Sequence, residues 1–205
     1  MDLLAQLSKH RALSIIRAPE IPDPVGIGRT LVEAGIPIVE FALTTPNALR
    51  LMEAAATVDG LILGAGTVMS AQDARDCVNA GATFLLTPGL RPAVAEEAVR
   101  QRVPLVLGAM TPTEVATAME LGAAAVKVFP AARLGPAYFG DLHGPYPDTP
   151  LVATGGLNAE NAAAFLAGGA IAVTAGSGVV SPKLAAESRL DEIGQRAEEF
   201  ISALG

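Results

Sequence analysis

The chain has 205 residues, of which 51% are hydrophobic and 17% are charged, and its net charge is −7. A chain of this length typically folds as one domain and buries roughly 70% of its unfolded surface, so we expect a single domain over residues 1–205. The acidic balance argues against nucleic acid or an anionic membrane surface as the main partner, and no uncharged apolar run reaches the roughly 18 residues of a spanning helix.

Short apolar runs recur along the whole chain and predict its strands. Most are continuous runs of Val, Ile, Leu and Ala, which is typical of parallel strands covered on both faces. The eight runs span residues 12–17, 37–41, 61–65, 83–87, 103–107, 124–129, 151–153 and 171–174.

Ala-rich stretches with helical spacing lie between these runs. We expect helices to start where an N-cap residue precedes a proline, at Asp23-Pro24, Thr45-Pro46 and Thr111-Pro112. Glu114 is placed to complete a capping box with Thr111. A left-handed glycine is expected to end a helix just before the next strand at Gly35, Gly81, Gly122 and Gly169.

Eight strands that alternate with helices, without a linker or a change in composition, predict an α/β fold of the closed (β/α)₈ TIM-barrel type. A doubly wound open sheet is the competing arrangement. Residues 1–9 and 191–204 are expected to form flanking helices.

Lysine is rare in this chain, and of Lys9, Lys127 and Lys183 one falls inside a predicted strand. Val126 and Val128 point away from Lys127, because side chains alternate along a strand. A lysine in this position pairs with a carboxylate, extends to water, or becomes a desolvated nucleophile that forms Schiff bases with carbonyl substrates. Position alone leaves these interpretations open.

Two other strands carry ionisable residues. Glu40, late in the second, provides a counter-ion for Lys127 and a candidate general acid or base. Arg17, at the end of the first, is suited to bind a substrate carboxylate with two hydrogen bonds. The structural alternatives are an ion pair between Glu40 and either Lys127 or Arg17, and a salt bridge from Arg17 to Glu20.

Glycine-rich turns follow several predicted strands. Gly64-Ala65-Gly66-Thr67 ends the third, and Met69 occupies the position of the last glycine of a dinucleotide-binding motif, so that motif is absent. Thr67 is either a hydroxyl donor to a bound carboxylate or a turn residue. Pro88, after the fourth strand, is either a rigid pocket wall or part of a plain turn.

The last two strands end in Gly155-Gly156 and Gly176-Ser177. Phosphate sites in this fold frequently form from the loops after strands seven and eight, where glycine lets backbone N–H groups approach an anion and a serine adds a hydroxyl. Either loop alone is weak evidence. Both together favour a phosphate site.

The single cysteine, Cys77, cannot form an internal disulfide, and no secretory signal is visible at the N-terminus. Both features predict a cytoplasmic protein. His10 and His143 are far apart in the sequence, so no metal site is expected. Aromatic residues make up 4% of the chain and Trp is absent, which argues against stacking on nucleic-acid bases.

Taken in order, the residues at the strand ends resemble the 2-keto-3-deoxy-6-phosphogluconate aldolase family, over nearly the whole chain from Ser14 to Val180. The pairing of a Lys-Val-Phe-Pro strand with a Gly-Ala-Gly-Thr turn is specific to it. The matching residues are Glu40, Gly64-Ala65-Gly66-Thr67-Val68, Thr87-Pro88-Gly89, Lys127-Val128-Phe129-Pro130-Ala131, Thr154-Gly155-Gly156 and Gly176-Ser177.

This resemblance implies a class I aldolase, without metal or other cofactor, that releases pyruvate and glyceraldehyde 3-phosphate from a phosphorylated sugar acid. It implies a (β/α)₈ barrel that forms a homotrimer. Lys127 would be the Schiff-base lysine and Glu40 the general acid or base. The residues around the pyruvate portion would be Arg17, Thr67, Pro88 and Phe129. Those around the phosphate would be Gly155, Gly156, Gly176 and Ser177.

The segment Leu43-Thr44-Thr45-Pro46 differs from the Leu-Arg-Thr that many gluconate-specific members have, and it resembles the phosphogalactonate branch. The preferred C4 epimer is therefore left open. Two other functions are weighed against an aldolase: a phosphate-binding barrel isomerase or epimerase, and a non-catalytic barrel that binds sugar phosphates.

Overall fold

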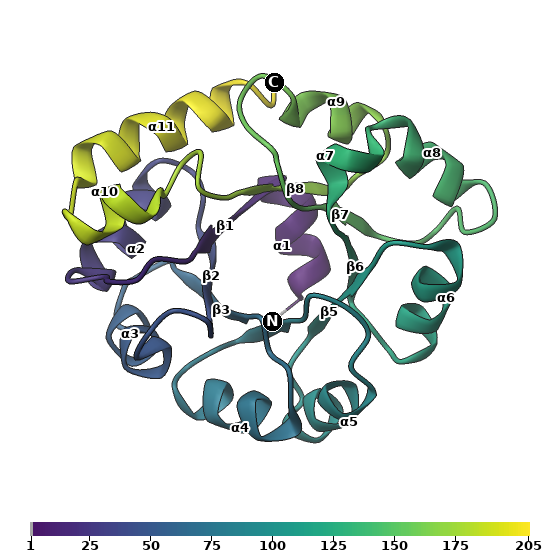
Figure 1. Ribbon diagram of the computed structural model, residues 1–205, viewed down its shortest axis with the longest axis horizontal. Coiled ribbons are helices and arrows are strands. Elements are labelled where there is room, and N and C mark those ends of the chain that lie inside the picture. The colour runs from purple at the N-terminus through teal and green to yellow at the C-terminus, as the bar shows by residue number, and fades with distance from the viewer. Residues whose placement is uncertain (1) are drawn as a thin grey trace.

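The computed structural model describes residues 2–205, and within them eight parallel strands form a closed barrel in the order β1 to β8 (Figure 1). Closure is made by β1 and β8, where Ala12 is in register with Val173 and Ser14 with Ala175. The predicted barrel is thus confirmed, and the open sheet is excluded. The strands are β1 (Ala12–Ile16), β2 (Ile38–Ala42), β3 (Ile62–Gly66), β4 (Phe84–Leu86), β5 (Leu105–Ala109), β6 (Ala125–Val128), β7 (Leu151–Ala153) and β8 (Ala172–Ala175).

Helices surround the barrel and cover its outer surface, as Figure 1 shows in the view along the barrel. None of the helices described between residues 2 and 205 is both long and apolar enough to cross a bilayer. The surrounding helices are α2 (Pro24–Glu33), α3 (Ala48–Ala55), α4 (Ala71–Asn79), α5 (Pro92–Gln101), α6 (Pro112–Glu120), α7 (Ala131–Leu134), α8 (Ala137–His143), α9 (Ala162–Ala167), α10 (Pro182–Ala186) and α11 (Leu190–Ser202).

Two of the three predicted helix starts are confirmed. Asp23 caps α2 by accepting a hydrogen bond from the Gly26 N–H at 2.7 Å, and Thr111 forms a capping box with Glu114 at the start of α6. The four predicted helix-ending glycines all have positive φ, between 81° and 114°.

The predicted helix start at Thr45-Pro46 is wrong. Helix α3 begins at Ala48, after Asn47 in a left-handed conformation. The Thr45 side chain is buried, and its hydroxyl accepts a hydrogen bond from the Ala18 N–H at 3.4 Å, so it joins the β2 loop to the β1 loop instead of capping a helix.

The apolar residues form two cores. The larger lies between the strands and the surrounding helices, and the smaller lies inside the barrel. The inner core is closed at the N-terminal end of the strands by α1 (Leu3–His10), which inserts Leu3 and Leu7 and lies within the outline of the barrel in Figure 1. Of the predicted flanking helices, the first is α1, with Met1 outside the described residues, and the second is α11.

Candidate active site

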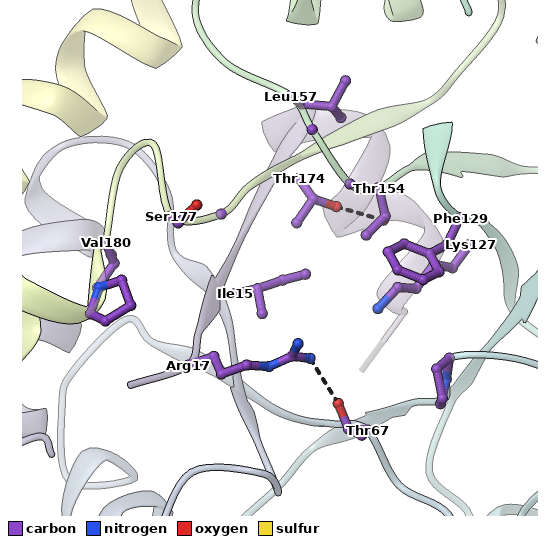
Figure 2. Close-up of a pocket in the computed structure, with 15 residues that line it drawn as sticks. Ile15, Arg17, Thr67, Lys127, Phe129, Thr154, Leu157, Thr174, Ser177 and Val180 are labelled. Carbon is purple, nitrogen blue, oxygen red and sulfur yellow. Dashed lines mark hydrogen bonds between the residues drawn. The ribbon is translucent and has the colours of Figure 1, made fainter. Parts of the chain in front are cut away.

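A cavity of about 360 Å³ opens at the C-terminal end of the barrel, opposite α1 (Figure 2). This is the end of a (β/α)₈ barrel at which active sites form. Except for Glu40, the residues that the sequence marked as candidates all line it: Arg17, Thr67, Pro88, Lys127, Phe129, Gly155, Gly156, Gly176 and Ser177.

Lys127 points into the barrel from β6. Its side chain is 7% exposed, whereas Val126 and Val128 face the surrounding helices, as the alternation along the strand predicted. The amine does not extend to bulk water. Its Nζ lies 3.8 Å from Glu40 Oε1 and 5.9 Å from the centre of the Phe129 ring, so it faces a buried carboxylate and an aromatic ring that lines the cavity.

Glu40 lies beside Lys127 on the inward face of β2, and its side chain is 1% exposed. Gly66 of β3 makes room for it, because a Cβ at that position would lie 2.5 Å from Glu40 Oε1. Burial raises the pKa of the Glu40 carboxyl, and the positive charges of Lys127 and Arg17 offset only part of this rise. Among the described residues Glu40 Oε2 has no hydrogen-bond partner, although it is fully buried.

Arg17 reaches the cavity from the opposite side to Lys127, as Figure 2 shows. One guanidinium nitrogen donates a hydrogen bond to Thr67 Oγ1 at 3.2 Å, and within residues 2–205 Arg17 forms no ion pair with Glu20, Glu40 or any other carboxylate. Among the described residues the charge of this exposed arginine is therefore not held in an ion pair, which suits it to bind an anionic ligand.

The β7 loop carries two glycines that no other residue could replace without strain. Gly155 and Gly156 have φ values of 97° and 76°, which side chains disfavour. A Cβ on Gly155 would also lie 3.0 Å from the Phe129 ring, and one on Gly156 would lie 2.6 Å from Ala132 Cβ. The backbone here lines the cavity, as do Gly176 and the exposed Ser177 of the β8 loop. Figure 2 shows the position of Ser177.

Residues 3–196 match the model of the KDPG and KHG aldolase family. The chain belongs to this family. It is 31% identical to 2-dehydro-3-deoxy-6-phosphogalactonate aldolase of Escherichia coli K12, over 96% of this chain and 95% of that protein. It is 29% identical to 2-dehydro-3-deoxy-phosphogluconate aldolase of Treponema pallidum, over 100% and 99%.

A solved structure adds information on the chemistry. The KDPG aldolase of Legionella pneumophila, with pyruvate captured as a covalent carbinolamine intermediate, superposes on this aldolase with a TM-score of 0.89 at 25% identity. The match covers 97% of both chains. Membership of the family makes the protein a class I aldolase, a lyase that cleaves a carbon–carbon bond.

The sequence did not reveal every residue that lines the cavity of this aldolase. Thr154, directly after β7, and Thr174, on β8, are buried and share a hydrogen bond of 2.8 Å between their hydroxyls (Figure 2). Period-two alternation from Val152 and Ala172 would have placed both on the inward face. Further lining residues that were not predicted are apolar: Ile15, Leu157, Val180 and Pro182.

Proposed function

We propose that this aldolase cleaves the C3–C4 bond of a phosphorylated 2-keto-3-deoxy sugar acid and releases pyruvate and glyceraldehyde 3-phosphate, with Lys127 as the Schiff-base residue. The observation that carries the proposal is the buried pair of Lys127 Nζ and Glu40 Oε1, 3.8 Å apart beside the cavity. The named relatives and the carbinolamine structure support it, since each is an aldolase of this substrate class.

The first step joins the amine to the substrate. Neutral Lys127 attacks C2 of the keto acid, a C–N bond forms, and the carbonyl oxygen becomes a hydroxyl. Glu40 then donates a proton as this hydroxyl leaves as water, which produces a protonated imine. Because burial raises its pKa, the Glu40 carboxyl holds a proton more readily than an exposed glutamate.

The second step breaks the carbon–carbon bond. The Glu40 carboxylate takes the proton of the C4 hydroxyl, C4 becomes an aldehyde carbon, and the electron pair of the C3–C4 bond moves toward the protonated imine. The resulting enamine takes a proton at C3, and water then hydrolyses the imine. This step frees pyruvate and restores the Lys127 amine.

The remaining lining residues would orient the two ends of the substrate. Arg17 and Thr67 are placed to bind the carboxylate of the pyruvate portion, with Pro88 and Phe129 as its walls. At the other end, backbone N–H groups of Gly155, Gly156 and Gly176, together with the Ser177 hydroxyl, would bind the phosphate.

Reduction with borohydride in the presence of pyruvate tests the Schiff base. We expect an irreversible pyruvate-derived adduct on Lys127, located by peptide mass spectrometry, and loss of the adduct in Lys127→Met. This variant should lower kcat by on the order of 10⁴-fold or more while thermal unfolding stays cooperative. Lys9→Met, at the opposite end of the barrel, is the matched control and should keep full activity.

An adduct on another lysine, or none at all, would contradict the proposed chemistry. A barrel isomerase or a non-catalytic sugar-phosphate binder would give no adduct and release no pyruvate. Pyruvate release is assayed in parallel from 2-keto-3-deoxy-6-phosphogluconate and from 2-keto-3-deoxy-6-phosphogalactonate. The comparison decides which C4 configuration this aldolase prefers.

We also propose that the protein works as a cytoplasmic homotrimer that binds no nucleic acid or membrane. The family resemblance supports the trimer, and the single cysteine and the net charge of −7 support the location and the absence of polyanionic partners. Light scattering of the purified chain should give the mass of three copies.

A further inference from the structure

Thr87 is a buried polar residue that the chemistry above does not use. It follows directly after β4, is 0% exposed, and does not line the cavity, whereas its neighbour Pro88 does. Burying a hydroxyl costs free energy unless it is hydrogen-bonded, so its partners indicate what it holds in place.

The Thr87 hydroxyl makes two hydrogen bonds that connect a loop to a strand. It donates to the Gly89 carbonyl at 2.7 Å, which closes the Pro88–Gly89 turn, and it accepts from the Gly108 N–H at 3.3 Å. Strand β4 ends at Leu86 whereas β5 continues to Ala109, so this side chain extends the contact between the two strands beyond the end of β4.

Gly108 allows the turn to lie directly against β5. A Cβ at this position would lie 2.3 Å from the Pro88 carbonyl carbon and 2.5 Å from the Gly89 nitrogen. Gly108 is also the register partner of Lys127 on β6. The turn that Thr87 holds therefore lies one strand away from the reactive amine.

We infer that Thr87 is a positioning residue: its hydroxyl fixes the Pro88–Gly89 turn on Gly108 and thereby sets the position of the Pro88 wall beside Lys127. The inference rests on the proposed function, because it needs Pro88 to contact the pyruvate portion of the substrate. Thr87 itself touches no substrate and acts through Pro88.

Thr87→Val tests this role, because it keeps the shape of the side chain and removes both hydrogen bonds. We expect kcat/KM for cleavage to fall roughly ten- to hundredfold, since displacements of about 1 Å in a positioning group have effects of this size. In the separate exchange of pyruvate methyl protons in deuterated water, the KM for pyruvate should rise while kcat stays close to the wild-type value. Thr87→Ser keeps the hydroxyl and should restore both values.

Thr83→Val is the matched control. Thr83 precedes the opposite end of the same strand and donates one hydrogen bond to the Leu63 carbonyl at 2.8 Å, far from the cavity. Loss of this hydrogen bond in Thr83→Val should leave kcat/KM unchanged. Should Thr87→Val not fold, Thr87→Ala removes the same hydroxyl from a smaller side chain.

A double-mutant cycle separates positioning from a general loss of stability. If Thr87 acts through Pro88, the variant with both Thr87→Val and Pro88→Ala should have the kcat/KM of Pro88→Ala alone. Additive losses, or a Thr87→Val enzyme within about twofold of wild type at a lower melting temperature, would overturn the inference. Borohydride trapping of the wild-type protein is run alongside, because failure there contradicts the proposed function itself.

Discussion

At the scale of single residues, the Lys127 amine and the Glu40 carboxyl are both removed from water, and the Glu40 Oε2 atom has no hydrogen-bond partner among residues 2–205. An arrangement of this kind lowers stability, because a buried polar atom without a partner keeps its desolvation cost. Its retention beside a cavity is expected where the groups are used for proton transfer.

Glu40→Gln should reveal this cost as a pH dependence. The raised pKa means that the folded protein holds the Glu40 proton more tightly than the unfolded chain, so the contribution of Glu40 to wild-type stability declines as pH rises above the ordinary glutamate value of 4.5. Glutamine does not titrate. The melting temperature of the variant minus that of wild type should therefore increase as pH rises above 4.5.

Thermal unfolding measured across this pH range checks the prediction, and Glu20→Gln, on an exposed side chain, is the control with a flat difference. A difference that shrinks with rising pH would show that the carboxylate is stabilised by the fold. Activity should fall roughly 10²- to 10⁴-fold in Glu40→Gln at every pH, because the variant lacks the proposed acid–base group.

Residue positions within strands were predictable where one residue type is rare or out of place. Lys127 and Glu40 interrupt apolar runs, and both were identified on that basis. The contact of Arg17 with Thr67 was not, because the two residues are 50 positions apart in the chain and follow β1 and β3, which are not neighbouring strands. The pairing of Thr154 with Thr174 was also missed, although it is a short-range one: the two residues are 20 positions apart and continue the register of β7 with β8.

At the scale of secondary-structure elements, helices α4 and α5 are joined by one buried carboxylate. The side chain of Glu97, on α5, is 3% exposed, and its Oε2 accepts hydrogen bonds from Arg75 of α4 at 2.9 Å and from Arg100 at 2.7 Å. The Gln101 side chain donates to Oε1. The hydrogen bond from Gln101 is the largest cause of a lowered pKa of the Glu97 carboxyl. The hydrogen bond from Arg100 and the positive charges of Arg100 and Arg75 lower it further.

Glu97→Gln should lower the melting temperature at pH 7, because it leaves Arg75 and Arg100 without their counter-ion. A lowered pKa contributes stability above the ordinary value of 4.5, and that contribution is lost as pH falls through the folded-state pKa. The difference from wild type should therefore disappear in strong acid. Glu96→Gln, on the exposed face of the same helix, should have little effect, and an equal effect would contradict the assignment.

Helix boundaries were predictable where the capping contact is local. Asp23 and Thr111 cap through residues three positions away, so a short sequence window contains the whole interaction. Thr45 has the same local pattern, yet its hydroxyl is used by Ala18, 27 positions earlier. The position of the Glu97 cluster depends on a similar contact between helices and was not visible in the sequence.

At the scale of the whole molecule, the barrel separates stability from chemistry along its axis. Each of the eight strands contributes an apolar side chain to the inner core, and α1 closes that core at the N-terminal end. The cavity occupies the C-terminal end. The strand pattern predicted the barrel, but nothing in the sequence of residues 1–9 indicated that this helix fills the barrel mouth instead of covering its outer surface.

Leu7 and Leu4 of α1 provide a matched test of this separation. Leu7 is 1% exposed in the inner core, and Leu4 is 40% exposed on the same helix. Leu7→Ala should lower the free energy of unfolding by about 2–5 kcal/mol, because it removes buried methyl groups and leaves a cavity. Leu4→Ala should change it by no more than about 0.5 kcal/mol.

Urea denaturation gives both free energies, and pyruvate release measured well below the melting temperature gives kcat/KM. Because the inner core lies between α1 and the cavity, Leu7→Ala should destabilise the fold and leave kcat/KM at the wild-type value. Lys127→Met should leave the fold stable and lower kcat/KM. A Leu7→Ala enzyme with impaired kcat/KM would mean that packing at the closed end controls the geometry of Lys127 and Glu40, and that the two ends of the barrel are coupled.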